Sequence, residues 1–241
     1  MDYLEEVIAL LQQAKASQAQ AVEQAAQAIA GAIQAGHLIY VFGASHAGIL
    51  AQELFYRAGG LVPVNPILPP GLMVDVRPVT LTSRLERLAG FGAQILAESP
   101  IEKGDVLIVH SVSGRNPAAV ELAEGARARG AFVIALTSLA FSRSVPPRGG
   151  SKRLFEVADL VLDNLAPPGD ALIDLPGTPA KVGPCSTVIG AALLNAVVVR
   201  ASLLLQAATG DAPVFLSANL EGGDEHNARW LEHYKGRLTY L

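Results

Sequence analysis

The chain has 241 residues, of which 51% are apolar and 17% are charged, and its formal net charge is −4. This length and apolar content allow one domain, or one and a half, with a full buried core. The negative charge and the lack of a face-wide stripe of Lys and Arg argue against a nucleic-acid partner. The single cysteine, Cys185, excludes an internal disulfide framework and a Cys-rich metal site, and its neighbours predict a buried, inert thiol.

Neither a signal peptide nor a membrane span is predicted. The N-terminal sequence lacks the basic start and the apolar core of a signal peptide. The most apolar segment, 188–208, contains Asn195 and Arg200, which are costly at bilayer depth. We therefore expect a soluble, cytoplasmic protein without a membrane partner, in which 188–208 is a buried or interface helix.

Residues 2–35 are predicted to be helical, because apolar residues recur at helical spacing from Leu4 to Ile33. Asp2 with Glu5 resembles a capping pair, and Gly36 ends the helix. The segment is rich in Ala and Gln and has few large apolar residues. Because such a helix is poorly stable alone, we expect it to pack on the body of the protein or on a second subunit.

Residues 38–42 form the first predicted strand, followed by a turn at 43–48 and a helix that runs to 58–60. The turn lacks the glycine spacing of a dinucleotide-binding fingerprint, and no acidic residue ends the next strand, 61–65. The Lys and Ser/Thr of a nucleotide P-loop are also absent from the turn. These departures argue against NAD and ATP, and we expect no cofactor.

A proline-rich loop, 63–78, precedes a predicted helix over 82–91. We interpret the charged residues of this helix, Arg84, Glu86 and Arg87, as a solvated face. The pattern of 93–98 fits either a short strand or a helix end.

The stretch 104–117 combines a buried strand with a polar turn and a helix start. An apolar run from Val106 leads to Ser111 and Ser113, and Asn116 can cap a helix that begins at Pro117. Free N–H groups and the helix dipole would then lie beside two hydroxyls, which predicts an anion site, most simply for phosphate. The alternative is a structural helix cap with two incidental serines.

Strands predicted at 131–136 and 158–163 complete an alternation of strands and helices. This alternation is typical of an α/β protein with a central parallel sheet flanked by helices. Ligands of such sheets bind beyond the carboxyl ends of the strands. Ser45, Ser111, Ser113 and Thr137 all follow strands at that edge.

The remaining polar segments each have a structural interpretation and a functional one. Basic residues in 141–153 indicate a surface loop, or a basic flap near the anion site. Asp163, Asp170 and Asp174 match no calcium-loop spacing, so turn chemistry explains them and no metal is expected.

Two helix starts are predicted in the last third of the chain. Ser186 or Thr187 caps the helix 188–208, which gives another hydroxyl-lined N-terminus, and Gly210 ends it. Asp224 caps a final helix and places His226 in its first turn, where a surface histidine is the simplest interpretation.

Four motifs in the same order resemble the sugar isomerase (SIS) domain family over about residues 36–205. They are the turn at 43–46, the motif Ser111-Val112-Ser113-Gly114-Arg115-Asn116 after an apolar strand, and the segments 130–137 and 158–162. The segments 55–60, 161–164 and 223–227 resemble an uncharacterised bacterial subgroup of SIS proteins. The resemblance implies a three-layer, flavodoxin-like fold, with an N-terminal helical segment at 1–35 and an SIS domain at 36–241.

The resemblance also implies a phosphosugar ligand and names residues that bind it. The hydroxyls and the amide of the central motif would hold the phosphate with a first-turn serine. Here Ala47 stands where that serine belongs, with Ser45 and His46 just before it, and Asn116 replaces the commoner Thr or Ser. The predicted binding set is Ser45, His46, Ser111, Ser113, Gly114, Asn116, Ser186 and Thr187.

Catalytic residues implied by the resemblance are a glutamate and a C-terminal histidine. Related enzymes carry the glutamate on the helix after the first turn, where Glu53 is the one acid, about one helical turn earlier than in the family. Its neighbours Leu50 and Leu54 predict a partly apolar setting that suits a base. The candidate histidine is His226. The alternative for each is an ordinary surface residue.

Two function classes remain open. The first is an enzyme, an aldose–ketose phosphosugar isomerase or a lyase-type etherase, which needs a base beside the carbonyl. The second is a non-catalytic phosphosugar sensor. Sensors of this family usually carry a DNA-binding domain, for which 1–35 is too short and too acidic, so the enzyme is favoured. SIS domains generally dimerise, and we expect a homodimer that places a residue of one subunit near the other's site.

Overall fold

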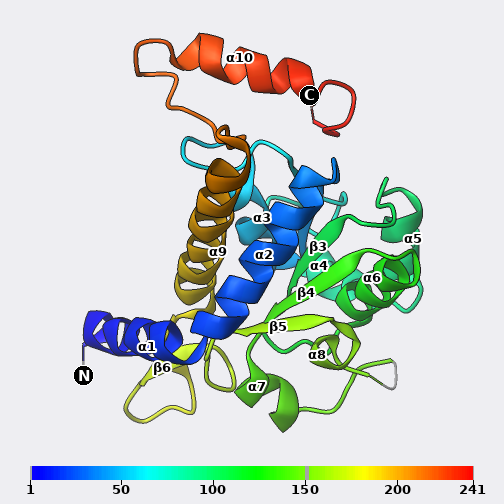
Figure 1. The fold of residues 1–241 in the computed structure, drawn as a ribbon. Coiled ribbons are helices and arrows are strands. Elements are labelled where there is room, and N and C mark those ends of the chain that lie inside the picture. Colours follow the sequence, from blue (N-terminus) through cyan, green and yellow to red (C-terminus); the bar gives the residue numbers. More distant parts are fainter. Residues whose placement is uncertain (1, 150–151, 241) are drawn as a thin grey trace.

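The structure, a computed structural model, describes residues 2–149 and 152–240. Its centre is a five-stranded, fully parallel sheet with the strand order β2-β1-β3-β4-β5 (Figure 1). This is the flavodoxin-like order, in which ligands bind where the strand order reverses, beside β1 and β3. The predicted three-layer α/β fold is confirmed.

The strands are apolar because both faces of the sheet are covered. β1 and β3 are buried at every position, and successive side chains enter opposite cores. Ile39 and Val41 face one core, whereas Tyr40 and Phe42 face the other. The strands are β1 (Ile39–Gly43), β2 (Val64–Ile67), β3 (Val106–His110), β4 (Phe132–Thr137) and β5 (Leu160–Asp163).

Two helical layers cover the sheet, on the left and right of Figure 1. The first contains α1 (Tyr3–Ser17), α2 (Ala19–Gln34), α3 (Ile49–Leu54) and α9 (Ser186–Thr209). The second contains α5 (Phe91–Ala97), α6 (Pro117–Ala128) and α8 (Leu154–Val157). Shorter elements complete the chain: η1 (Ser45–Gly48), α4 (Thr80–Leu85), α7 (Leu139–Ser144), the hairpin β6 (Ala171–Asp174) and β7 (Lys181–Pro184), and α10 (Gly223–His233).

The N-terminal segment forms two helices where the sequence predicts one. Gln18 interrupts the helix, with φ −103° and ψ 3°, and its side-chain oxygen accepts a hydrogen bond from the Asp163 N–H at 3.0 Å. Asp2 caps α1 through the Leu4 N–H. α2 packs against α9 and buries Ala25 and Ile29 among other residues, so its apolar face is covered by the body of its own chain.

Several element boundaries differ from the sequence-based prediction. α3 ends at Leu54, because Phe55 is extended and Tyr56 has a φ of 44°. The second strand begins at Val64, since Leu61 instead forms an isolated antiparallel bridge with Val214. The helix predicted over 82–91 ends at Leu85. The segment 93–98, whose pattern fits either a short strand or a helix end, belongs to the helix 91–97.

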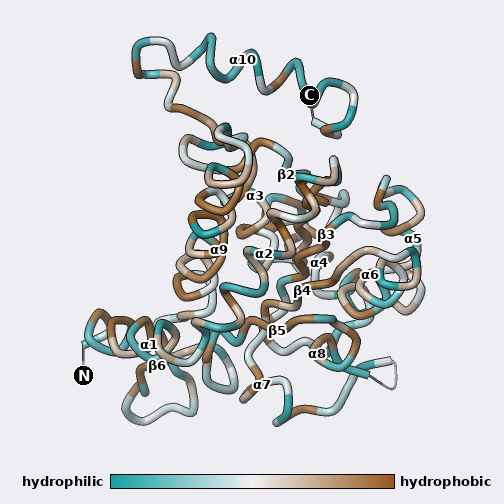
Figure 2. Tube along the Cα trace, viewed as in Figure 1, coloured by the Kyte–Doolittle hydropathy of each residue, from teal (hydrophilic) through white to brown (hydrophobic). Residues whose placement is uncertain are grey.

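α9 is the most continuously apolar helix of the described chain (Figure 2). It is long and apolar enough to cross a membrane by length and composition, yet 44% of its most apolar window is buried inside the protein. It packs on α2, α1 and α3, as expected for a core helix of an α/β layer.

The C-terminal segment lies at the amino-terminal edge of the sheet. Asn65, in β2, accepts a hydrogen bond from the Thr239 N–H at 2.8 Å, and the Arg237 guanidinium donates to the Gly36 carbonyl. α10 therefore sits at the opposite end of the molecule from α7 (Figure 1). Its N-cap is Gly222, two residues before the predicted Asp224.

Candidate functional site

The loops after β1 and β3 enclose a cavity of about 230 Å³ at the carboxyl edge of the sheet. Five residues of the predicted binding set meet there: Ser45, His46, Ser111, Ser113 and Asn116. The other lining residues are Ala44, Ala47, Glu86, His110, Val112, Ala119 and Phe141. The cavity thus lies at the edge where the topology predicts a ligand.

The loop after β1 is a tight 3₁₀ turn that requires glycine at its start. A Cβ atom at Gly43 would lie 2.3 Å from the Ala47 carbonyl oxygen, so no larger residue fits. Ser45 has a φ of 57°, which is uncommon outside glycine, and its N–H donates to the Leu72 carbonyl at 2.6 Å. These contacts hold Ser45 and His46 at the cavity wall.

The loop after β3 is shaped by Gly114, which has a φ of 57°. Its N–H donates to the Ser111 carbonyl at 3.1 Å, and its carbonyl accepts from the Leu154 N–H at 2.8 Å. A Cβ atom at Gly114 would lie 3.0 Å from the hydroxyls of Thr137 and Ser142. Gly114 therefore does not line the cavity but fixes the loop that carries the two serines.

The hydroxyls of Ser111 and Ser113 are free donors in the cavity. Within the described part of the chain, neither hydroxyl has a hydrogen-bond partner, so both can bind a ligand. Asn116 occupies the N-cap of α6, yet its side chain does not cap the helix, and its buried Oδ1 has no partner among the described residues. The predicted helix start at Pro117 is confirmed, but the Asn116 side chain lines the cavity instead of capping the helix.

His110 ends β3 at the floor of the cavity. It is buried, and its Nδ1 lies 3.1 Å from the Ala47 carbonyl oxygen, to which it donates. Burial lowers the pKa of His110 to about 4, so the imidazole is neutral at pH 7. Its Nε2 then carries a lone pair and has no hydrogen-bond partner in the described chain.

Glu86 supplies a carboxylate, and it is the one such group among the described lining residues. It follows α4 directly, and its carbonyl accepts a hydrogen bond from the Ala118 N–H of α6 at 3.2 Å. Burial raises the pKa of Glu86, against the opposing effect of the adjoining Asn116 amide and of Arg87 and Arg148. The site thus combines hydroxyl donors with a carboxylate that holds its proton more tightly than usual.

Comparisons with known proteins agree with this geometry. The chain matches the SIS domain family over residues 2–138. It is also 46% identical over 240 residues to a UPF0309 protein of Shouchella clausii, across 99% of this chain and 98% of that protein.

The chain belongs to the SIS domain family.

Two solved structures support the fold of this SIS domain. A phosphoheptose isomerase from Neisseria gonorrhoeae has a TM-score of 0.52 and 18% identity, over 83% of this chain and 94% of that chain. The Vibrio vulnificus NanR protein complexed with ManNAc-6P has a TM-score of 0.50 and 16% identity, over 96% of this chain and 67% of that chain. At these identities the likeness concerns the fold.

Glu53, the predicted base, lies outside the cavity of the SIS domain. Its carboxylate pairs with Arg57 one turn along the chain and accepts a hydrogen bond from the Asn195 amide of α9 at 3.2 Å. The expected apolar setting is therefore wrong, because the neighbouring turn and α9 supply polar partners. Glu86 has the placement that the sequence assigned to Glu53.

His226, the predicted second catalytic residue, is also remote from the cavity of its own chain. Its Nε2 lies 2.9 Å from the Val214 carbonyl oxygen, and the side chain borders a groove beside Val199 and Leu203 of α9. The tail runs to the amino edge of the sheet, so it does not fold over the site of its own subunit.

The start of α9 is closed by a carboxylate rather than open to an anion. The N-cap is Cys185, and Asp170 accepts hydrogen bonds from the N–H groups of Cys185 and Ser186 at 3.2 and 2.8 Å and from the Ser186 hydroxyl. The predicted capping by Ser186 or Thr187 is thus wrong, and neither residue lines the cavity. Burial raises the pKa of the Cys185 thiol to about 12, in the direction expected for the buried thiol that the sequence predicts.

The other two aspartates also have structural roles. The Asp163 carboxylate accepts from the N–H groups of Leu139 and Leu165, and Asp174 pairs with Lys181 across the β6–β7 hairpin. Turn and pair chemistry therefore accounts for them, as the sequence indicates.

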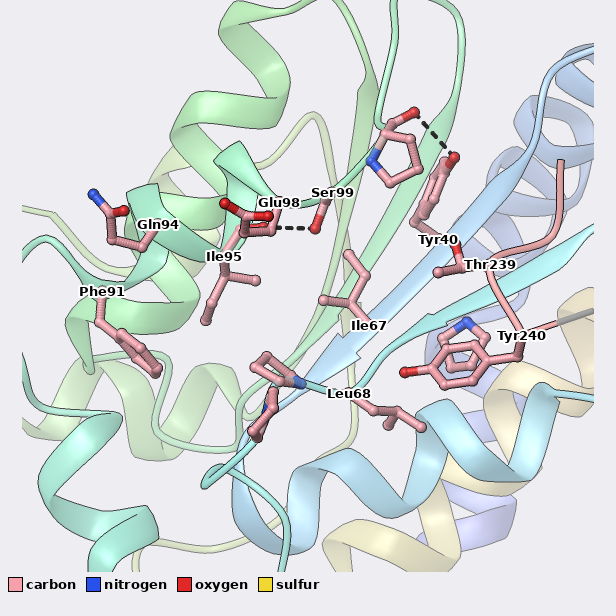
Figure 3. Close-up of a pocket in the computed structure, with 14 residues that line it drawn as sticks. Tyr40, Ile67, Leu68, Phe91, Gln94, Ile95, Glu98, Ser99, Thr239 and Tyr240 are labelled. Carbon is pink, nitrogen blue, oxygen red and sulfur yellow. Dashed lines mark hydrogen bonds between the residues drawn. The ribbon is translucent and has the colours of Figure 1, made fainter. Parts of the chain in front are cut away.

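A second cavity, of about 310 Å³, lies between β2 and α5 (Figure 3). Its walls are mostly apolar, with Ile67, Leu68 and Phe91 among them. Two of its four hydroxyls serve the fold, because Tyr40 donates to the Pro100 carbonyl at 3.1 Å and Ser99 donates to the Ile95 carbonyl at 2.6 Å. The smaller cavity is the candidate site, because it lies at the carboxyl edge of the sheet, where ligands of parallel sheets bind.

Proposed function

We propose that this SIS protein binds a phosphosugar in the hydroxyl-lined cavity and catalyses aldose–ketose isomerisation. The observation that carries the proposal is the meeting of Ser111, Ser113 and Glu86 in one cavity of about 230 Å³. Two free hydroxyls suit an oxyanion, and the carboxylate suits a base. The fold shared with a phosphoheptose isomerase and with a protein complexed with ManNAc-6P supports the same ligand class.

The phosphate is placed at the loop after β3. Ser111 and Ser113 donate their hydroxyl protons to phosphate oxygens, and Ser45 approaches from the loop after β1. The positive end of the α6 dipole lies at the same loop and favours an anion. The sugar then extends across the cavity toward Glu86.

The proton transfer is assigned to Glu86. Its carboxylate takes the proton from the carbon beside the carbonyl while the carbonyl oxygen takes a proton from solvent, which gives an enediol. The resulting carboxylic acid then returns its proton to the former carbonyl carbon as the neighbouring hydroxyl gives its proton back to solvent. The protein ends in its starting state and no redox partner is needed. The raised pKa of Glu86 brings the carboxyl closer to the neutral range in which a general base is most effective.

Solvent proton exchange tests this proposal. We expect the protein to incorporate deuterium from heavy water beside the carbonyl of a phosphosugar drawn from a panel of aldose and ketose phosphates. Glu86→Gln should lower turnover by about 10²–10⁴-fold, the usual contribution of a positioned acid–base group, while phosphosugar binding persists.

Glu53→Gln is the matched control, because it makes the same substitution in the carboxylate that lies outside the cavity. Its turnover should stay close to that of the parent protein. A large loss in Glu53→Gln with little effect of Glu86→Gln would contradict the assignment. Binding without exchange would favour the sensor, and exchange with loss of an ether substituent would favour the etherase.

A further inference from the structure

Three arginines meet beside the cavity although they are far apart in the sequence. Arg115 belongs to the loop after β3, and the Arg148 N–H donates to its carbonyl at 3.0 Å. Arg87 directly follows Glu86, whose carbonyl is bonded to the Ala118 N–H of α6. These backbone bonds bring all three guanidinium-bearing residues to the start of α6. We call them the arginine cluster.

The residues of the arginine cluster lack carboxylate partners within the described chain. Arg57, Arg127, Arg153, Arg200 and Arg229 each pair with a carboxylate, but none of the three cluster residues has such a pair within the described chain. The Nε of Arg115 is buried and has no hydrogen-bond partner among the described residues. Burial, and then repulsion from Arg87 and Arg115, lowers the pKa of Arg148, which shows that the charges act on one another.

The cluster borders the candidate site through two lining residues. Asn116 follows Arg115 in the chain, and Glu86 precedes Arg87, and both line the cavity. The Glu86 carboxylate lies within electrostatic range of Arg87 and Arg148, and Arg148 lies within range of Arg87 and Arg115.

We propose that the arginine cluster is a second anion subsite, and that the ligand is a phosphosugar with a second anionic group. This inference rests on the proposed function, because the first phosphate occupies the serine loop. Guanidinium groups bind phosphate and carboxylate with paired, charge-assisted hydrogen bonds, so either group fits. The second anion also offsets the repulsion within the cluster.

Pairs of ligands with and without a second anionic group test the subsite and distinguish a second phosphate from a carboxylate. Binding is measured calorimetrically with fructose 6-phosphate and fructose 1,6-bisphosphate, and with glucose 6-phosphate and 6-phosphogluconate. We expect tighter binding of one or both doubly anionic ligands, and the pair that shows the difference identifies the second group as phosphate or carboxylate.

Arg148→Gln and Arg87→Gln should each weaken binding of the doubly anionic ligand by on the order of tenfold, as expected for a lost hydrogen bond to a charged group. Binding of the singly phosphorylated sugar should be kept. Arg127→Gln is the control, since it removes the same charge from the far end of α6. It should leave the preference intact. Arg87 is exposed, so its variant tests the proposal even if Arg148→Gln folds poorly.

Two outcomes would overturn the subsite. In one, the parent protein binds singly and doubly anionic ligands equally well. In the other, the cluster variants weaken both ligands alike, which would assign the cluster to the first phosphate. In both cases binding of a phosphosugar still supports the proposed function, whereas the absence of any phosphate-dependent binding would contradict the proposed function itself.

Discussion

Two carboxylates, those of Glu53 and Glu86, differ in what surrounds them. Glu53 faces Arg57 and Asn195, whereas Glu86 faces a cavity lined by hydroxyls. No local pattern distinguishes them in the sequence, because Glu86 reaches the cavity through a contact between α4 and α6, 32 residues apart along the chain at the Glu86–Ala118 bond. Long-range packing therefore determines which of the two carboxylates lines the cavity.

Because His110 is buried in its neutral form, it should make the folded protein less stable as the pH is lowered. The unfolded chain binds a proton at this residue near pH 6.5, whereas the folded protein does so only near pH 4. Between these values the unfolded state binds more protons, so stability falls as the pH is lowered, by up to roughly 3 kcal/mol.

The measurement is urea unfolding of the parent protein and of His110→Gln at several values between pH 4 and pH 7. The variant is expected to be less stable at pH 7 but to lose less stability on acidification. Because all other titrating groups are shared, the difference between the two curves isolates His110. Parallel curves would contradict the assignment of a neutral, buried imidazole.

Helices and strands are predicted best where a continuous run of apolar residues determines them. The four strands expected at 38–42, from 104, at 131–136 and at 158–163 all occur within about two residues of their predicted bounds, because parallel strands buried on both faces give continuous apolar runs. Helix starts are predicted less well. Asp170 caps α9 from 16 residues away, a contact that no local capping pattern reveals.

Gly114→Ala tests how the loop after β3 holds the two serines. An alanine there must adopt a left-handed φ of 57°, at a cost of about 1–2 kcal/mol, and its Cβ crowds Thr137 and Ser142. We expect lower stability and loss of the melting shift that a phosphosugar produces in the parent protein.

Gly36→Ala is the control for the backbone cost alone. Gly36 has a φ of 81°, and a Cβ atom there would have nothing within 4 Å. This variant should lose similar stability but keep the ligand-induced shift. A normal ligand shift in Gly114→Ala would show that the loop geometry does not position the serines.

The whole molecule leaves an apolar face on the outer side of α9 and on α1. Val199 and Leu203 are 58% and 57% exposed, and Leu4 and Ile8 are exposed as well. We propose that a second copy of the chain covers this face, in keeping with the dimerisation that the family resemblance implies. His226 borders the same face beside Val199 and Leu203, so a dimer would bring it to the partner subunit.

Light scattering at micromolar concentration tests the assembly. The parent protein should have the mass of a dimer, and Leu203→Asp should shift it toward a monomer because a charge would be buried at the interface. Leu88→Asp is the control, since Leu88 is exposed between α4 and α5, beside the other helical layer. A monomeric parent protein, or equal behaviour of the two variants, would contradict the proposed dimer.

The central claim is that the serine loop binds the phosphate of a sugar, and a melting experiment with matched ligands tests it most directly. A phosphosugar at 100 times its dissociation constant should stabilise the parent protein by roughly 2.7 kcal/mol, and the unphosphorylated sugar should not. Ser113→Ala should lose most of this stabilisation, whereas Ser202→Ala, which removes a hydroxyl of α9 that bonds the Val198 carbonyl, should keep it. An equal melting shift with the phosphorylated and the unphosphorylated sugar, or an undiminished shift in Ser113→Ala, would contradict the account.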